Sequence, residues 1–371
     1  MSFGRCGFRR AVVSVGYLLV GLIGCELGVA VSLAQESIEG KYLTNIRQVT
    51  AGFEKAGEGY FSPDMSTIIY QAIRPEYPFY QIYSQPLENG TPRLISTGRG
   101  RTTCSYFSPD GKQILFASSH LHPDMDAVEQ QERAQQAEDR KTGKRRRYSW
   151  DFDPYMDIYV CDLDGQNRTR LTSEYGYDAE GSYSRDGRLI AYCHAEETPA
   201  TDTAEATRNP DLYVMNADGS GKRRITTAAG YDGGPFISPD GQWIVYRTDR
   251  LKPEHLQIHV IGIDGQNDLA LTDEPNHINW APYWHPTKPW LIWTGADHTD
   301  PRARPNYDLY VMPYQVVDGK FVKGAVTRIT DAPAADVLPV FSPDGNRLMW
   351  TSTRAADGTS QLFIADLKLP E

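Results

Sequence analysis

The sequence predicts an all-β protein, a six-bladed β-propeller in which an N-terminal strand closes the last blade. Three observations predict this fold: a turn element that occurs six times, an apolar strand after each turn, and a further strand in each unit that begins with Asp or Gln. Repeats with a period of roughly 40 to 60 residues are typical of propellers and solenoids. The six copies of the turn, built on Phe-Ser-Pro-Asp-Gly, are residues 61–65, 107–111, 183–187, 237–241, 284–288 and 341–345.

Each unit is predicted to be one four-stranded antiparallel sheet. The turn leads into an apolar strand such as 113–116 or 243–246, and a last strand ends in Arg-Leu-Thr or a relative. These strands are apolar on both faces, so each sheet needs a neighbour on both sides, which radial stacking of blades supplies. The recurring strand that begins with Asp or Gln is found at 81–83, 157–160, 211–215, 257–260, 308–312 and 361–364.

The two ends of the repeat region indicate how the ring closes. The last unit stops just after 361–366 and lacks its Arg-Leu-Thr strand, whereas a strand-like segment at 46–50 precedes the first complete unit. We therefore expect 46–50 to pair beside 361–366, so that residues 41–371 form one propeller. An open solenoid would need capping units instead.

The largest interruption of the repeat is a predicted helical and basic insertion at 120–154. Residues 125–140 are rich in Gln, Glu and Ala, which favours a helix, and six of the eight residues in 140–147 are basic. Two interpretations remain open for this insertion. It forms a solvated helix and loop, or it forms an arm over one face of the ring that contacts an acidic partner or the acidic body.

The N-terminus has the pattern of an export signal. Three arginines precede an apolar run that ends in Ser-Leu-Ala, which predicts a signal peptide at 1–34 with cleavage after Ala34. One alternative is a lipoprotein signal that ends before Cys25, and another is that the apolar run stays as a membrane anchor. In each case we expect a periplasmic or otherwise extracytoplasmic protein.

Charge and cysteine usage exclude two classes of protein. The formal net charge of −10 argues against nucleic acid as a partner. Beyond the predicted signal peptide, Cys104, Cys161 and Cys193 are an odd number of cysteines on separate predicted strands, so no disulfide framework is indicated. We expect these cysteines to be small buried apolar residues. We also expect the protein to be a monomer.

The innermost strand of each unit is predicted to place acidic side chains around one mouth of the central channel. Side chains two residues apart lie on the same side of a strand, so two positions of each strand are relevant. The first position holds Ala56, Thr102, Asp178, Asp232, Asn279 and Asp336, and the second holds Glu58, Cys104, Glu180, Gly234, Ala281 and Leu338. The predicted binding residues are Asp178, Glu180, Asp232, Asn279, Asp336 and Glu58.

Carboxylates held close together favour the approach of a cation. One candidate is a metal ion such as Ca²⁺, for which Asp178, Asp232 and Asp336 are the predicted ligands. The other is a Lys, an Arg or an amino terminus of a partner chain. Alternatively, each Asp caps the start of its own strand through a local backbone hydrogen bond. The Asp residues of five turns, Asp64, Asp110, Asp186, Asp240 and Asp344, are expected to be structural.

The repeats resemble those of the TolB-type, WD-repeat-like β-propellers of bacterial envelopes, over about residues 41–369. This resemblance implies a non-catalytic envelope protein that binds a protein or peptide, without a cofactor other than the Ca²⁺ considered above. The absence of Gly-x-Ser-x-Gly and His-Glu-x-x-His motifs from the sequence argues against serine and zinc hydrolases.

The propeller is also similar to oligogalacturonate lyases, which bind metal through His and polar side chains near the axis. The alternative function is therefore a metal-dependent polysaccharide lyase that uses the same axial face. Its site would lie around Asp178, Glu180, Asp232, His277 and Asp336. Three histidines fall within one unit: His277, His298, and His285, which is expected to cap its turn.

Overall fold

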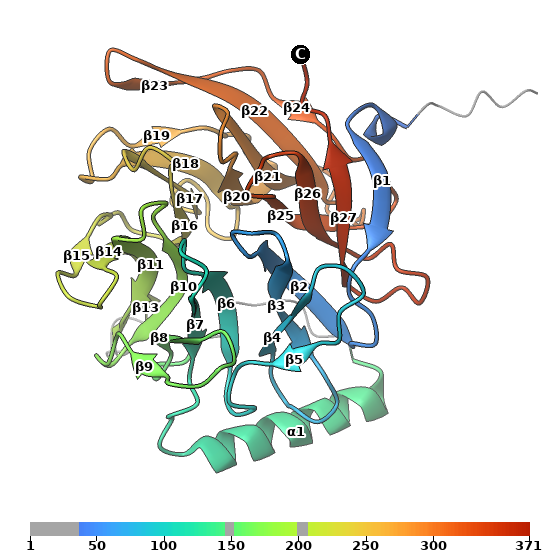
Figure 1. Cartoon of the computed structure of the whole chain (residues 1–371), viewed down its shortest axis with the longest axis vertical. Coiled ribbons are helices and arrows are strands. Elements are labelled where there is room, and N and C mark those ends of the chain that lie inside the picture. Colours follow the sequence, from blue (N-terminus) through green and yellow to red (C-terminus); the bar gives the residue numbers. More distant parts are fainter. Residues whose placement is uncertain (1–36, 145–151, 199–206) are drawn as a thin grey trace, which may run out of the picture. The chain divides into compact units, whose positions relative to one another are not determined.

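The computed structural model describes residues 37–144, 152–198 and 207–371, and Ser37–Glu371 forms one compact unit. The described residues form six blades, each built on a four-stranded antiparallel sheet. Figure 1 shows the blades arranged around a common centre. The predicted six-bladed β-propeller is confirmed.

The first strand of each blade is innermost, and the strands follow one another outward. Blades one to three contain β2 (Lys55–Phe61), β3 (Thr67–Ile73), β4 (Gln81–Pro86) and β5 (Arg93–Leu94); β6 (Thr102–Phe107), β7 (Gln113–Ser118), β8 (Asp157–Asp162) and β9 (Thr169–Arg170); and β10 (Tyr177–Tyr183), β11 (Leu189–Ala195), β14 (Asp211–Asn216) and β15 (Arg223–Arg224).

Blades four to six repeat this order, and the last blade takes its outer strand from the N-terminus. They contain β16 (Asp232–Ile237), β17 (Trp243–Thr248), β18 (Gln257–Gly262) and β19 (Leu269–Ala270); β20 (His277–Trp284), β21 (Trp290–Asp297), β22 (Asp308–Val317) and β24 (Thr327–Arg328); and β25 (Asp336–Phe341), β26 (Arg347–Ser352), β27 (Gln361–Leu367) and β1 (Leu43–Gln48). Smaller elements are η1 (Glu39–Lys41), the pair β12 (Glu197–Thr198) and β13 (Thr207–Arg208), and β23 (Lys320–Lys323) beside β22.

The ring closes on itself through the two ends of the repeat region. Each innermost strand contacts the innermost strand of the next blade, and β25 contacts β2. Strand β1 pairs antiparallel with β27, with Leu43 opposite Leu367. The Thr50 hydroxyl then donates to Gln361 Oε1 at 2.9 Å and accepts the N–H of Leu362 at 2.9 Å. The expected closure is confirmed, and the strand begins three residues earlier than 46–50.

Thr50 occupies the place that the threonine of Arg-Leu-Thr holds in other blades. In blade three, Thr226 accepts the N–H of Leu212 at 2.9 Å and donates to Asp211, while Arg224 donates to the same carboxylate at 2.5 Å. In blades two, three and five the recurring strands are therefore joined by an Asp–Arg–Thr cluster, and in blades one, four and six Gln stands in place of the Asp. This contact explains why the Asp and the Arg-Leu-Thr recur together in the sequence.

The Ser-Pro-Asp-Gly turns are held by one hydrogen-bond pattern. In blade two, Ser108 donates to Asp110 at 2.6 Å and accepts the N–H of Gln113 at 2.9 Å, and Gly111 has a left-handed φ of 69°. In blade five, Nδ1 of His285 takes the part of serine and accepts backbone N–H groups at 3.2 and 3.0 Å. The predicted structural role of the turn Asp residues and the predicted cap by His285 are confirmed.

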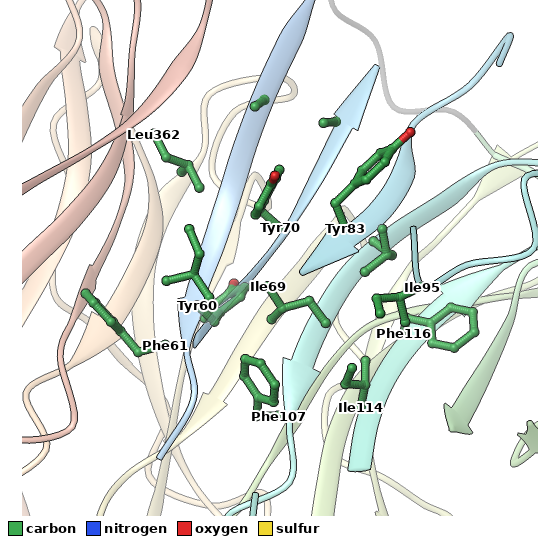
Figure 2. Packing of buried hydrophobic residues seen from close by; sticks show 14 of the residues in the cluster. Tyr60, Phe61, Ile69, Tyr70, Tyr83, Ile95, Phe107, Ile114, Phe116 and Leu362 are labelled. Carbon is green, nitrogen blue, oxygen red and sulfur yellow. The ribbon is translucent and has the colours of Figure 1, made fainter. Parts of the chain in front are cut away.

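The hydrophobic core lies between neighbouring blades. Figure 2 shows part of the largest cluster, in which Tyr70 of blade one packs among side chains that include Phe116 of blade two and Leu362 of blade six. All three side chains are fully buried. Burial of each large apolar side chain contributes roughly 1.5–3 kcal/mol. Both faces of blade one are therefore covered, as two-faced apolar strands require.

The insertion between β7 and β8 contains the predicted helix, α1 (Met125–Thr142), which runs two residues further than 125–140. Its side chains contact the loop before β4, where Arg133 donates to the Glu76 carbonyl and Gln136 to the Pro78 carbonyl, both at 2.7 Å. Residues 145–147 of the basic run lie outside the described residues.

The structure shows how the three cysteines are buried and whether a described helix could span a membrane. Cys161 and Cys193 are buried, Cys104 is half-buried, and all three are free thiols. None of the helices in the described ranges is both long enough and apolar enough to span a membrane. The predicted signal at 1–34, with its alternative at Cys25, lies outside the described residues.

Candidate functional site

The two ends of the ring are defined by the direction of the innermost strands. All six strands finish in turns that gather at one end, which we call the lower end. The opposite end, where these strands begin, is the upper end. Side chains at the first predicted position are at most 5% exposed: Ala56, Thr102, Asp178, Asp232, Asn279 and Asp336.

Two of the buried aspartates are bonded to an arginine of their own blade. Arg250 donates to both carboxylate oxygens of Asp232, at 2.9 and 2.8 Å. Arg354 donates to one oxygen of Asp336 at 2.5 Å, and the indole N–H of Trp350 donates to the other at 3.0 Å. Burial raises the pKa of Asp336, although the charge of Arg354 opposes this. Each of these carboxylates therefore has a cation beside it within its own blade.

The polar residues of blades three and five have different partners. Oδ1 of Asp178 lies 2.7 Å from Nδ1 of His194, while its buried Oδ2 accepts no hydrogen bond within the described part of the chain. Burial alone would lower the pKa of His194, but the hydrogen bond and charge of Asp178 raise it. Asn279 accepts the indole N–H of Trp293 at 3.0 Å and donates to Gln257 at 3.1 Å. Asp178 thus retains one unpaired oxygen.

The second predicted position forms a β-bulge in every blade. The pairing of each innermost strand with the next strand shifts register there. Non-glycine residues seldom adopt a left-handed φ, and bulges re-aim side chains. The left-handed residues are Glu58 (φ 49°), Cys104 (53°), Glu180 (60°), Gly234 (60°), Ala281 (52°) and Leu338 (56°).

Side chains from four blades converge inside the ring at this level. The Cys104 thiol of blade two hydrogen-bonds to the Glu58 carboxylate of blade one. Glu180 of blade three and Arg247 of blade four also act electrostatically on Glu58. Burial raises the pKa of Glu58 to about 7, against the effect of the Cys104 hydrogen bond. We call Glu58, Cys104, Glu180, Arg247 and Tyr231 the upper cluster.

Within the upper cluster, Glu180 is the carboxylate held by several donors. Arg247 donates to it at 2.7 Å, the Tyr231 hydroxyl at 2.9 Å and the N–H of Gly234 at 2.5 Å. A Cβ on Gly233 would lie 2.6 Å from Glu180 Oε2 and 2.2 Å from the Tyr231 hydroxyl. The Gly-Gly pair is therefore required for this close approach. Of the two glutamates in the upper cluster, Glu58 has fewer hydrogen-bond donors than Glu180.

Four aromatic side chains close the interior below the upper cluster. Tyr60 and Phe236, from blades one and four, have ring centroids 6.1 Å apart. The hydroxyls of Tyr106 and Tyr283, from blades two and five, lie 2.9 Å apart. Since both pairs join blades on opposite sides of the ring, they span its interior. We call these four residues the aromatic belt.

The structure brings only part of the predicted site together. Glu58 and Glu180 share the ring interior, whereas Asp178, Asp232 and Asp336 bond within their own blades. Asn279 bonds to Trp293 of its own blade and to Gln257 of blade four. The cations beside these residues were not among the predicted site residues. A signal for two of them exists in the sequence, because Arg250 and Arg354 both follow their aspartate by 18 residues.

The three histidines of blade five lie at different places along the blade. His277 begins β20, His285 follows the other end of that strand, and His298 lies 3.0 Å from the Tyr307 hydroxyl. Across residues 37–144, 152–198 and 207–371, no three His, Cys, Asp or Glu side chains are grouped so that they could hold a metal ion. A Ca²⁺ site at Asp178, Asp232 and Asp336 stays a prediction.

Comparison with known sequences gives distant relatives. No protein-family model matches the chain. An uncharacterized protein of Agrobacterium fabrum is 26% identical over 216 residues, which are 54% of this chain and 58% of the relative. The Tol-Pal system protein TolB of Francisella tularensis subsp. holarctica is 25% identical over 222 residues, 55% of this chain and 49% of the relative. The chain thus spans about half the length of these curated relatives.

Comparison with solved structures supports the fold. A protein of Agrobacterium tumefaciens described as TolB has a TM-score of 0.53 at 19% identity, covering 87% of this chain and 97% of that one. TolB from Acinetobacter baumannii has a TM-score of 0.51 at 17% identity, covering 86% of this chain and 65% of that one. The fold of this chain is that of a TolB-like propeller, as the repeats predicted.

Proposed function

We propose that the protein is a non-catalytic, extracytoplasmic, TolB-like propeller that binds an envelope protein or peptide at the upper end of its ring. The partner inserts a cationic group, a Lys, an Arg or an amino terminus, beside the upper cluster. The observation that carries this proposal is the position of Glu58, a carboxyl in the ring interior whose side-chain hydrogen bond comes from the Cys104 thiol. The likeness to TolB proteins supports the partner class.

The electrostatics of the upper end favour a cation. Burial raises the pKa of Glu58 to about 7, so an ammonium or guanidinium beside it would stabilise the ionised form. The unpaired Oδ2 of Asp178 is a second acceptor at the same end. The starts of three innermost strands are fixed by the hydrogen bonds of Asp232, Asn279 and Asp336, and these strand starts surround the upper end. The aromatic belt limits the depth that a side chain can reach.

We propose that the protein is extracytoplasmic and that its partner carries a basic segment. The predicted signal at 1–34 would export the propeller, with the lipoprotein alternative at Cys25 leaving it tethered to a membrane. A formal net charge of −10 favours a partner with a basic segment, because long-range attraction speeds encounter. We take the protein to be a monomer.

The test is an affinity capture from cell-envelope extract at pH 6 and at pH 8. Wild type is compared with Glu58→Gln, which keeps the shape of the side chain and removes its charge, and with Glu54→Gln, an exposed acid just before the same strand. We expect one protein to be retained more strongly at pH 8 by wild type and Glu54→Gln, and weakly at both pH values by Glu58→Gln. Equal capture by all three proteins would contradict the proposal.

The alternative of a metal-dependent polysaccharide lyase stays a prediction. It requires that wild type, given Mn²⁺ or Ca²⁺, releases unsaturated products from oligogalacturonate and stops when the metal is chelated. The proposed binding function predicts no product under these conditions. Product formation that is lost in Asp178→Asn would replace the binding function by the lyase.

A further inference from the structure

The lower end of the ring contains a pocket of about 310 Å³ that the proposed function does not use. The aromatic belt contributes Tyr106, Phe236 and Tyr283 to its lining, so the pocket is separated from the upper cluster. The walls come from the turns of all six blades and are mostly apolar. They include Pro63, Pro109, Pro239, Pro286 and Pro343, together with Phe61, Phe107, Tyr183, Trp284 and Phe341.

One blade departs from the repeat at this pocket. Where five turns have proline, the turn of blade three has Arg185. Among the residues that line the pocket, all within the described ranges, Arg185 is the only charged one. Its Nη1 donates to the carbonyl of Pro286 at 2.7 Å. Because Pro286 belongs to blade five, the side chain extends past blade four and across the pocket.

The guanidinium of Arg185 has unused binding capacity. Arginine carries five N–H donors, and the hydrogen bond to Pro286 uses one nitrogen. In the part of the chain that the structure describes, Arg185 forms no ion pair. Its neighbour Arg188, which does not line the pocket, instead lies 3.7 Å from Asp186. The pocket therefore combines apolar walls with one available cation.

We infer that this pocket binds a small apolar carboxylic acid, with the carboxylate on Arg185 and the apolar body against the prolines and aromatic rings. Guanidinium groups pair with carboxylates through two parallel hydrogen bonds, which are stronger than neutral ones. A single cation matches a single negative charge, which favours a carboxylate over a phosphate. Aromatic walls with few polar groups are typical of small-molecule sites.

The size of the pocket favours a free acid over a peptide chain. Its volume is at the lower limit of ligand sites, which hold roughly 300–1,000 Å³. The belt closes its inner end, so a ligand has only the depth of the turns to occupy. An acid of about the size of N-acetylphenylalanine is the expected occupant.

The experiment titrates the full chain with N-acetyl-L-phenylalanine and with its primary amide, which has the same body and no charge. Calorimetry or ligand-observed NMR should show that the acid binds about tenfold or more tightly than the amide. Arg185→Gln should lose this preference, whereas Arg188→Gln, the matched exposed arginine, should keep it. Arg185→Pro restores the repeat and gives a second variant without the cation.

Each of the following results would overturn the inference. Equal binding of acid and amide, or no binding of the acid to wild type, would remove the role of the charge. Unchanged binding by both Arg185 variants would place the acid elsewhere. Tighter binding of an acetylated tetrapeptide that ends in phenylalanine would assign the pocket to a chain end instead of a free acid. If Arg185→Gln changes only the melting temperature, the arginine serves to join blades three and five.

Discussion

The same six innermost strands present different chemistry at their two ends. At the lower end, the turns of five blades use nearly one sequence and one hydrogen-bond pattern, and the surface is formed by prolines and aromatic rings. At the upper end, the backbone repeats the same bulge, but the side chains differ from blade to blade. The repeat therefore builds the ring, and the side chains that depart from it are the ones that we propose bind ligands.

The charged side chains that differ from the repeat also differ in how their charges are balanced. Asp232 and Asp336 each have an arginine in their own blade, so their charges stabilise the strand starts. Glu58 has a neutral thiol as its hydrogen-bond partner, and Arg185 has a neutral carbonyl. The groups with neutral partners are the ones available to a ligand. Four substitutions compare these groups and the two ends of the ring, from the largest expected effect to the smallest.

The largest effect is expected when a balanced upper-end pair is broken. Arg250→Gln leaves the carboxylate of Asp232, which is 1% exposed, without its cation. Removing one partner of a buried ion pair costs about 3–5 kcal/mol of unfolding free energy. Urea denaturation at pH 7 measures this loss. The control Arg302→Gln removes an exposed pair with Asp300 and should change stability by less than about 1 kcal/mol. A loss of similar size in both variants would contradict the balance assigned to Asp232.

Glu58 should behave in the opposite way. Its pKa is raised from 4.5 in the unfolded chain to about 7, so the folded protein holds its proton more tightly. Its contribution to stability is therefore complete below pH 4.5 and is lost as the pH rises through 7. Glu58→Gln removes this loss and should stabilise the protein by on the order of 3 kcal/mol at pH 8, with a much smaller change at pH 5. Denaturation at both pH values, with Glu54→Gln as control, measures the difference; a Glu58→Gln effect independent of pH would show that the carboxyl titrates normally.

The contact between β1 and β27 closes the ring, and weakening it should cause an intermediate loss of stability. Thr50→Val keeps the shape of the side chain and removes the hydrogen bonds to Gln361 and Leu362. A loss of about 1–2 kcal/mol is expected, with faster amide exchange along β27. Thr44→Val, at an exposed position of β1, is the matched control and should have little effect. Exchange that rises equally in all six blades would mean that the outer strand does not act as a local latch.

The smallest effect is expected at a single turn of the lower end. Ser238→Ala removes the hydrogen bonds to Asp240 and to the N–H of Trp243. Because five other turns remain, a loss of about 1 kcal/mol is expected in thermal or chemical denaturation. Ser220→Ala in an exposed hairpin serves as control. A loss above that of Arg250→Gln would reverse the order of the two ends.

Much of the fold follows from the sequence because each repeat carries its own local chemistry. The turn, the Asp-Leu-Tyr-Val strand and the closing strand that leads to Thr50 are recognisable without tertiary information. The site was predicted only in part. The sequence places Glu58 and Asp178 at channel positions. It does not show that His194, in the second strand of its blade, and Arg250, two residues after that strand in the next blade, bond the buried aspartates. Such contacts depend on rotamers and on bulge geometry.

The most direct test of the account is the titration of the Glu58 side-chain carboxyl by NMR, in sodium chloride and in n-butylammonium chloride of equal ionic strength. The butylammonium ion carries the charged end of a lysine side chain. We expect a midpoint near pH 7 in sodium chloride, as the pKa of about 7 indicates, and a shift to lower pH by about half a unit or more in butylammonium. A midpoint near the ordinary value for glutamate, unchanged by the cation, would contradict the claim that the upper cluster receives a cationic group.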